Sequence, residues 1–169
     1  MVDFNKMLTH DRPVPLDLAG FNAAPPDEVR PVLTACLAVP RWVDAVLAGR
    51  PYPDLDALVA AAEAAGPLPA GETRRAIGAH PRIGEKATGW SRSEQSGVDS
   101  AAAEKFRAAN AEYERRFGHV YLVCASGRGG DELLADLQRR MGNDPETELA
   151  VAGRELIEIA KLRLRKAVS

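Results

Sequence analysis

Prolines and glycines divide this chain into short segments in which apolar residues recur every three or four positions. That spacing places the apolar side chains on one face of an α-helix. Gly49-Arg50-Pro51 and Gly66-Pro67 each end such a segment. Pro25-Pro26 and Asp144-Pro145 each precede one, as is typical of helix starts. The expected helices span residues 27–37, 40–48, 55–65, 69–79, 101–116, 131–141 and 145–166.

One stretch, residues 119–125 (H-V-Y-L-V-C-A), has the composition of a β-strand. It lacks strict alternation of apolar and polar residues, and no second strand is expected to pair with it. We therefore expect an extended buried segment among helices. Residues 1–26 hold prolines at 13, 15, 25 and 26 and are expected to form an extended, proline-rich lead-in. The sequence predicts an all-α fold over residues 1–169, a single compact domain of about seven to nine helices with no significant sheet.

Charge and composition argue against several classes of function. The formal net charge is -2 and no basic block is present, so no nucleic-acid partner is expected. No apolar run approaches the roughly 20 residues that a membrane-spanning helix needs. Cys36 and Cys124 lie in apolar runs and are interpreted as reduced core residues in a cytoplasmic protein, with a disulfide as the less favoured alternative. The two cysteines and three histidines match no metal-ligand spacing, so neither a metal nor another cofactor is expected.

Residues 79–97 concentrate polar side chains, glycines and a proline between two expected helices. His80 ends the first of these helices and precedes Pro81, which favours an extended backbone at the histidine. A histidine in such a position is most often a surface or capping residue. The polar residues around His80 shift the interpretation toward a functional site, because loops on a rigid scaffold often carry one.

Ser91-x-x-Glu94 matches the capping-box pattern, which is its structural interpretation. That interpretation is compatible with function, because Ser91, Glu94 and Gln95 would gather at a helix N-terminus that favours a ligand carboxylate. A hydrolase built on Ser91, His80 and Glu94 is an alternative, but the chain has no G-x-S-x-G elbow. The remaining hypothesis is proton transfer by histidine and glutamate beside an anion, which needs no cofactor.

Five blocks of the sequence resemble the 2-oxo-4-hydroxy-4-carboxy-5-ureidoimidazoline (OHCU) decarboxylases of urate breakdown. In order across residues 79–165 they are H-P-R-I-G-E, W-S-R-S-E-Q-S-G-V, F-G-H-V-Y-L-V-C-A, G-N-D-P-E-T-E-L and I-A-K-L-R-L. The resemblance implies an all-helical, cofactor-free enzyme, usually a homodimer, that converts OHCU to (S)-allantoin and carbon dioxide in purine catabolism. It further implies functional coupling to urate oxidase and 5-hydroxyisourate hydrolase.

The resemblance also implies roles for individual residues. His80 would be the catalytic acid/base, with Glu94 assisting it. Arg163 would be the arginine of the L-R-L motif in the last helix. The implied substrate-binding residues are Pro81, Ser91, Arg92, Ser93, Gln95, His119, Val120, Tyr121, Leu122, Val123 and Arg163.

Two departures from the family pattern leave the detailed substrate contacts open. Arg82 stands where many members have an acid, and His119-Val120-Tyr121 stands where many have F-P-F. Two other hypotheses remain beside the decarboxylase. One is a cofactor-free hydrolase or lyase acting on a related ureide, and the other is a non-enzymatic helical interaction domain in which S-x-x-E only caps a helix.

Overall fold

The computed structural model describes residues 16–79 and 100–168. These two ranges contain eight helices and no strand, which confirms the all-α prediction. No helix in them is long and apolar enough to cross a membrane. The helices are α1 (Leu18–Ala23), α2 (Pro26–Cys36), α3 (Pro40–Ala48), α4 (Leu55–Ala64), α5 (Ala70–Ile77), α7 (Ser100–Phe117), α8 (Gly130–Arg140) and α9 (Pro145–Ala167).

Capping aspartates and prolines set several helix starts. Asp54 Oδ1 accepts a hydrogen bond from the N–H of Ala57 at 2.7 Å, and Asp144 Oδ1 accepts one from the N–H of Thr147 at 2.8 Å. These oxygens satisfy amide groups that have no partner in the first helical turn. Helices α2, α3 and α9 begin with a proline, whose missing N–H is not needed there. The seven helices expected after residue 26 are confirmed, with ends that agree to within two residues.

The prediction that residues 1–26 are extended is wrong for α1. Asp17 Oδ1 accepts a hydrogen bond from the N–H of Gly20 at 2.6 Å, and Phe21 is completely buried in the core. A capped turn with one buried aromatic side chain is therefore stable between the flanking prolines, which lie outside it. Residues 1–15 lie outside the described part of the chain.

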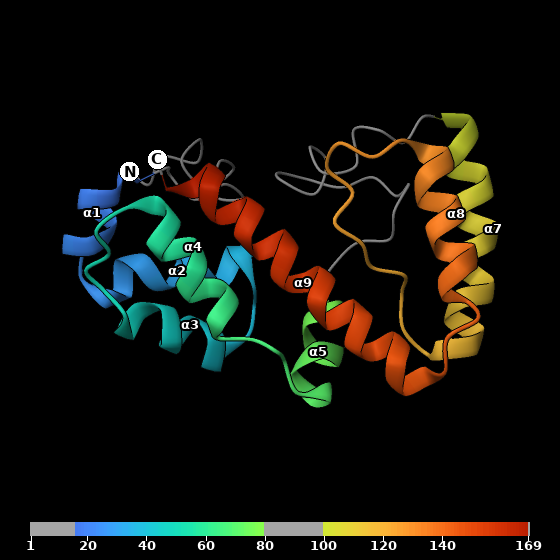
Figure 1. The fold of residues 1–169 in the computed structure, drawn as a ribbon, viewed down its shortest axis with the longest axis horizontal. Coiled ribbons are helices and arrows are strands. Elements are labelled where there is room, and N and C mark those ends of the chain that lie inside the picture. The colour runs from blue at the N-terminus through green and yellow to red at the C-terminus, as the bar shows by residue number, and fades with distance from the viewer. Residues whose placement is uncertain (1–15, 80–99, 169) are drawn as a thin grey trace, which may run out of the picture.

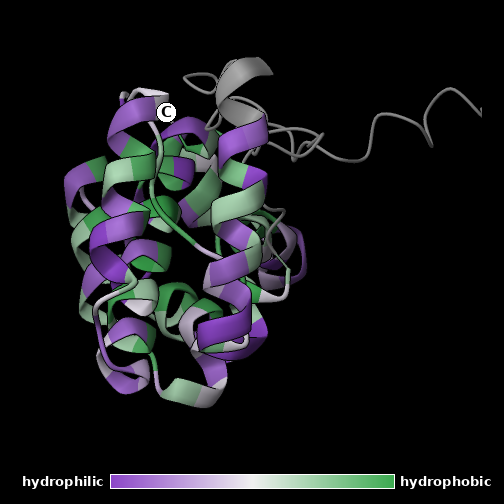
Figure 2. Ribbon diagram, turned by 90° about the vertical axis from the view of Figure 1, so that its right-hand side faces the viewer, coloured by the Kyte–Doolittle hydropathy of each residue, from purple (hydrophilic) through white to green (hydrophobic). Residues whose placement is uncertain are grey.

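Helix α9 crosses the molecule diagonally and connects its two halves (Figure 1). It contacts α2, α4 and α5 on one side of the molecule, while α7 and α8 pack against each other at the far end. Apolar positions face inward on these helices and polar positions face outward (Figure 2). The buried side chains form two clusters. The N-terminal core comprises residues of α1 to α5 and α9 with Leu122, and the C-terminal core comprises Phe106, Tyr113, Tyr121, Val123, Ala125, Leu133 and Leu137.

Residues 119–125 run between these two cores. The side chains of Tyr121, Val123 and Ala125 enter the C-terminal core, whereas Leu122 enters the N-terminal core. Such alternation is the period of an extended backbone. It confirms the prediction of an extended buried segment, and it explains why the sequence shows no polar alternation there. Both faces of the segment pack against apolar side chains, so both faces are apolar.

Candidate active site

The structure describes only part of the site that the sequence predicts. His80, Pro81, Ser91, Arg92, Ser93, Glu94 and Gln95 lie outside the described residues. Residues 119–123 and Arg163 lie within them. The described part of the site is therefore one face of the extended segment together with the last helix.

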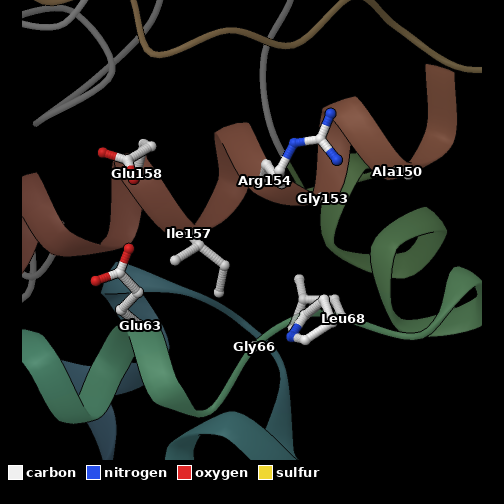
Figure 3. Close-up of a pocket in the computed structure, with 9 residues that line it drawn as sticks. Glu63, Gly66, Leu68, Ala150, Gly153, Arg154, Ile157 and Glu158 are labelled. Atoms are coloured by element: carbon white, nitrogen blue, oxygen red, sulfur yellow. The ribbon is translucent and has the colours of Figure 1, made fainter. Parts of the chain in front are cut away.

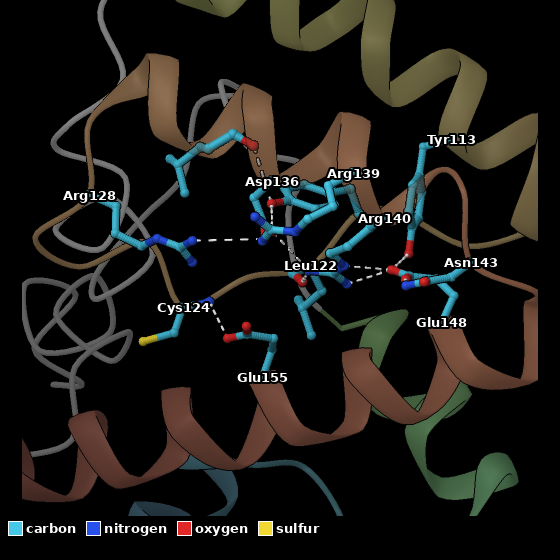
Figure 4. A network of polar contacts seen from close by, with 12 residues as sticks. Tyr113, Leu122, Cys124, Arg128, Asp136, Arg139, Arg140, Asn143, Glu148 and Glu155 are labelled. Atoms are coloured by element: carbon cyan, nitrogen blue, oxygen red, sulfur yellow. Dashed lines mark hydrogen bonds and ion pairs between the residues drawn. The ribbon is translucent and has the colours of Figure 1, made fainter.

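Two side chains hold the backbone of this segment in place of a neighbouring strand (Figure 4). Arg140 Nη1 of α8 donates a hydrogen bond to the carbonyl oxygen of Leu122 at 2.8 Å. The N–H of Cys124 donates one to Glu155 Oε2 of α9 at 3.0 Å. Buried backbone groups need partners, and here charged side chains supply them.

The middle of the segment has backbone donors that the described residues do not satisfy. Tyr121, Leu122 and Val123 are at most 5% exposed. Within residues 16–79 and 100–168, their N–H groups donate to no backbone or side-chain acceptor. Buried N–H groups without a partner are rare in folded proteins. This arrangement suits a ligand whose oxygens accept hydrogen bonds from the backbone.

The side chain of His119 packs against aromatic rings at the start of the segment. Its ring lies edge-on to Tyr113 with centroids 5.5 Å apart and stacks on Phe117 at 6.1 Å. His119 Nδ1 lies 3.1 Å from the carbonyl oxygen of Val120. The residue is half-buried. These contacts make the histidine part of the packing that orients the segment.

Arg163 is 8% exposed on α9. Its Nη1 donates a hydrogen bond to the carbonyl oxygen of Ala35, in the last turn of α2, at 3.3 Å. One nitrogen of the guanidinium thus ties α9 to α2. A guanidinium carries five N–H donors, and the bond to Ala35 uses one of them.

A buried polar network connects the extended segment to α7, α8 and α9 (Figure 4). Glu148 is completely buried and accepts hydrogen bonds from Tyr113 Oη at 2.5 Å, Arg140 Nε at 2.7 Å and Asn143 Nδ2 at 3.0 Å. Asp136 Oδ2 accepts one from Tyr121 Oη at 2.5 Å, and the same carboxylate pairs with Arg139 and Arg140.

The network sets the protonation of its members. Burial, followed by the hydrogen bond to Glu148, raises the pKa of the Tyr113 hydroxyl. Burial and the hydrogen bond to Asp136 raise the pKa of Tyr121 in the same way. Burial would lower the pKa of Arg140, but the hydrogen bond and charge of Glu148 outweigh it and raise that pKa. Both phenols therefore stay neutral donors and Arg140 stays a cation.

Comparison with known proteins decides the family. A family model described as OHCU decarboxylase matches residues 22–165. The chain belongs to this family.

Curated relatives and solved structures agree with this assignment. An OHCU decarboxylase from Amia calva is 30% identical over 138 residues, which cover 73% of this chain and 78% of that protein. The "Uric acid degradation bifunctional protein TTL" of Arabidopsis thaliana is 34% identical over 106 residues, or 56% of this chain and 33% of that protein. The match thus spans about a third of the plant protein's length.

Two solved structures share the fold. A crystal structure of an OHCU decarboxylase in the presence of (S)-allantoin superposes with a TM-score of 0.65 at 26% identity, covering 79% of this chain and 94% of that one. An (S)-allantoin synthase superposes with a TM-score of 0.68 at 19% identity, and the match covers 92% of this chain and 54% of that one. At that identity the second likeness concerns the fold alone. Membership of the OHCU decarboxylase family supports a decarboxylase, that is a carboxy-lyase, activity.

Sequence reasoning missed Arg140, Glu148 and Glu155, which hold the segment directly or through one another. Asp136 and Arg140 stand four residues apart on the inward face of α8, a spacing that brings side chains together. Glu148 directly precedes the apolar Leu149 within the G-N-D-P-E-T-E-L block. These positions were the signal in the sequence that the three charged residues could be buried. It is a weak signal, because charged side chains in proteins are usually exposed.

A surface pocket of about 320 Å³ lies elsewhere, between the α4–α5 connection and α9 (Figure 3). Pro67, Leu68 and Ile157 give it apolar walls, and Glu63, Arg154 and Glu158 are its charged residues. Lys161 Nζ links two of these, at 3.5 Å from Glu63 and 3.1 Å from Glu158. None of the lining residues is a predicted site residue.

Proposed function

We propose that this chain is a cofactor-independent decarboxylase that converts OHCU to (S)-allantoin and carbon dioxide in urate catabolism. Membership of the OHCU decarboxylase family carries the proposal. The matched range includes H-P-R-I-G-E and S-R-S-E-Q as well as the extended segment and α9. In the bond change, the carboxylate leaves a carbon that also bears a hydroxyl and adjoins a C=N bond. The electron pair of the broken bond moves toward that C=N bond and leaves an enol-like intermediate.

A proton must then reach one face of the neighbouring carbon to give the S configuration. We assign this acid/base work to His80, because an imidazole with an ordinary pKa near 6.5 exchanges protons at neutral pH. Glu94 assists, either by holding one tautomer of His80 or by handling the hydroxyl proton. Pro81, Ser91, Arg92, Ser93 and Gln95 complete this half of the proposed site.

The other half of the proposed site is supported by the described residues. The N–H groups of Tyr121 and Val123, which have no acceptor within the described residues, suit oxygens of the substrate. His119, Val120 and Leu122 belong to the same segment. The guanidinium of Arg163 adds a planar cation for substrate oxygens. Preorganised donors and charges of this kind stabilise the negative charge that develops during carbon dioxide loss.

We further propose that the enzyme works as a cytoplasmic homodimer beside urate oxidase and 5-hydroxyisourate hydrolase. Family resemblance supports the dimer and the pathway partners. The interpretation of Cys36 and Cys124 as reduced core thiols supports the compartment.

The test supplies OHCU in situ from urate and follows (S)-allantoin by circular dichroism. We expect (S)-allantoin to appear faster with the purified chain than in a blank that contains only the generating enzymes. Formation at the blank rate would contradict the proposal. Urate and 5-hydroxyisourate serve as control substrates, since activity on either would indicate a different ureide-related reaction.

A further inference from the structure

Glu155 is the residue of α9 whose carboxylate reaches the extended segment. Its Oε2 accepts the hydrogen bond from the N–H of Cys124 at 3.0 Å (Figure 4). The side chain is half-buried, and within the described ranges no cation lies within ion-pair distance of it. A half-buried carboxylate that accepts a hydrogen bond from a peptide N–H is arranged to hold that peptide.

Arg140 holds the same segment two residues earlier. Its Nη1 donates to the carbonyl oxygen of Leu122 at 2.8 Å, and Glu148 in turn holds the guanidinium through Nε at 2.7 Å. Arg140 and Glu148 are 4% and 0% exposed, so the arginine cannot move without leaving a buried charge unpaired. The two partners come from different helices, α8 and α9.

The positions of these two bonds determine which peptide groups remain for a ligand. In an extended chain, the N–H and C=O of one residue point to one edge, and those of its neighbours point to the other. Bonds at residues 122 and 124 therefore hold one edge. The N–H groups of Tyr121 and Val123 belong to the opposite edge, and both are unsatisfied within the described residues.

We infer that Glu155 is a positioning residue for substrate binding, acting through the Cys124 peptide to aim the N–H groups of Tyr121 and Val123 at the substrate. This inference rests on the proposed function, because it takes the extended segment as a substrate-binding element. Glu155 does not exchange a proton with the substrate in this role. It needs only an oxygen that accepts a hydrogen bond from the Cys124 N–H.

That requirement distinguishes two variants. Glu155→Gln keeps a carbonyl oxygen at the same distance from the backbone, whereas Glu155→Ala removes the acceptor. We expect Glu155→Ala to lower kcat/KM for OHCU by about 10- to 100-fold, because small displacements of positioning groups have effects of this size. Glu155→Gln should keep most of the activity. Glu158→Ala is the matched control on the same helix. It should behave like the wild type, because within the described residues Lys161 is the only hydrogen-bond or ion-pair partner of this surface carboxylate.

Two activity patterns would overturn the inference. Equal losses of kcat/KM in Glu155→Gln and Glu155→Ala would show that the negative charge of the carboxylate, and not its hydrogen bond to the peptide, is needed for activity. Wild-type activity in both variants would remove the residue from the site. A thermal melt of each variant checks that the fold is retained, and the glutamine variant keeps the test decisive if the alanine variant unfolds.

Amide hydrogen exchange tests the structural step without any substrate. We expect the Cys124 amide to exchange faster in Glu155→Ala than in the wild type, and to stay protected in Glu155→Gln. Unchanged exchange in Glu155→Ala would contradict the inference. If the wild-type chain fails to decarboxylate OHCU, the proposed function fails, while the exchange measurement still decides whether Glu155 holds the segment.

Discussion

Two buried phenols, Tyr113 and Tyr121, should make this protein less stable at alkaline pH. Burial and then the hydrogen-bonded carboxylate raise the pKa of each hydroxyl above its ordinary value of 10.0. Above that value the unfolded chain releases these protons while the folded chain keeps them. The two phenols therefore stabilise the fold fully below about pH 10, and that contribution is lost as the pH rises further.

Urea unfolding measured from about pH 8 to pH 11 checks this expectation. The free energy of unfolding of the wild type should fall above about pH 10. In Tyr113→Phe the fall should be shallower, because one of the two raised groups is gone. An identical slope in the two proteins would show that the hydroxyl does not titrate differently on folding.

The exchange of His80 for alanine tests the catalytic assignment at the level of one side chain. A positioned acid/base group contributes about 10²–10⁴-fold to a rate, so His80→Ala should lose activity by that factor. Far-UV circular dichroism should remain that of a helical protein. Activity close to the wild-type value in a folded His80→Ala protein would exclude His80 from the mechanism.

At the scale of elements, Glu148 joins three helices. It stands in the first turn of α9 and accepts hydrogen bonds from Tyr113 of α7 and Arg140 of α8. Glu148→Ala would remove the closer of the two anions that pair with buried Arg140 and leave it with Asp136 at 3.4 Å. Removing one partner of a buried ion pair costs about 3–5 kcal/mol of stability. Glu158→Ala removes a surface pair to Lys161 and should cost less than about 1 kcal/mol. Equilibrium urea unfolding measures both, and similar losses in the two variants would contradict the role of Glu148.

The helices could be predicted because their boundaries are local. Asp54 and Asp144 cap their helices through neighbours three residues away, so the pattern is visible in the sequence. Helix α1 was missed because its stability depends on Phe21, which is buried by residues distant in sequence. The bonds of Arg140 and Glu155 to the extended segment span 18 and 31 residues, and no local pattern reveals such contacts. The functional motifs themselves were found by resemblance, and two of the five blocks lie outside the described residues.

For the whole molecule, we expect a single unfolding transition although there are two cores. Helix α9 connects the two halves, and the extended segment contributes side chains to both cores. Trp42 reports on the N-terminal core, where it is fully buried and its Nε1 donates to the carbonyl oxygen of Ala62 at 3.0 Å. In Trp90→Phe it is the remaining tryptophan. Its fluorescence should change at the same urea concentration as far-UV circular dichroism, which follows all helices. Two separate midpoints would mean that the cores unfold independently.

The alternation of residues 119–125 between the cores also limits how the chain length can change. Adding or deleting one residue there would exchange the two faces, so that Leu122 and the tyrosine beside it would each be directed into the wrong core. The same change would move the peptide groups held by Arg140 and Glu155 to the opposite edge. We therefore expect insertions and deletions to be tolerated in the connections on either side of this segment, but not within the segment itself.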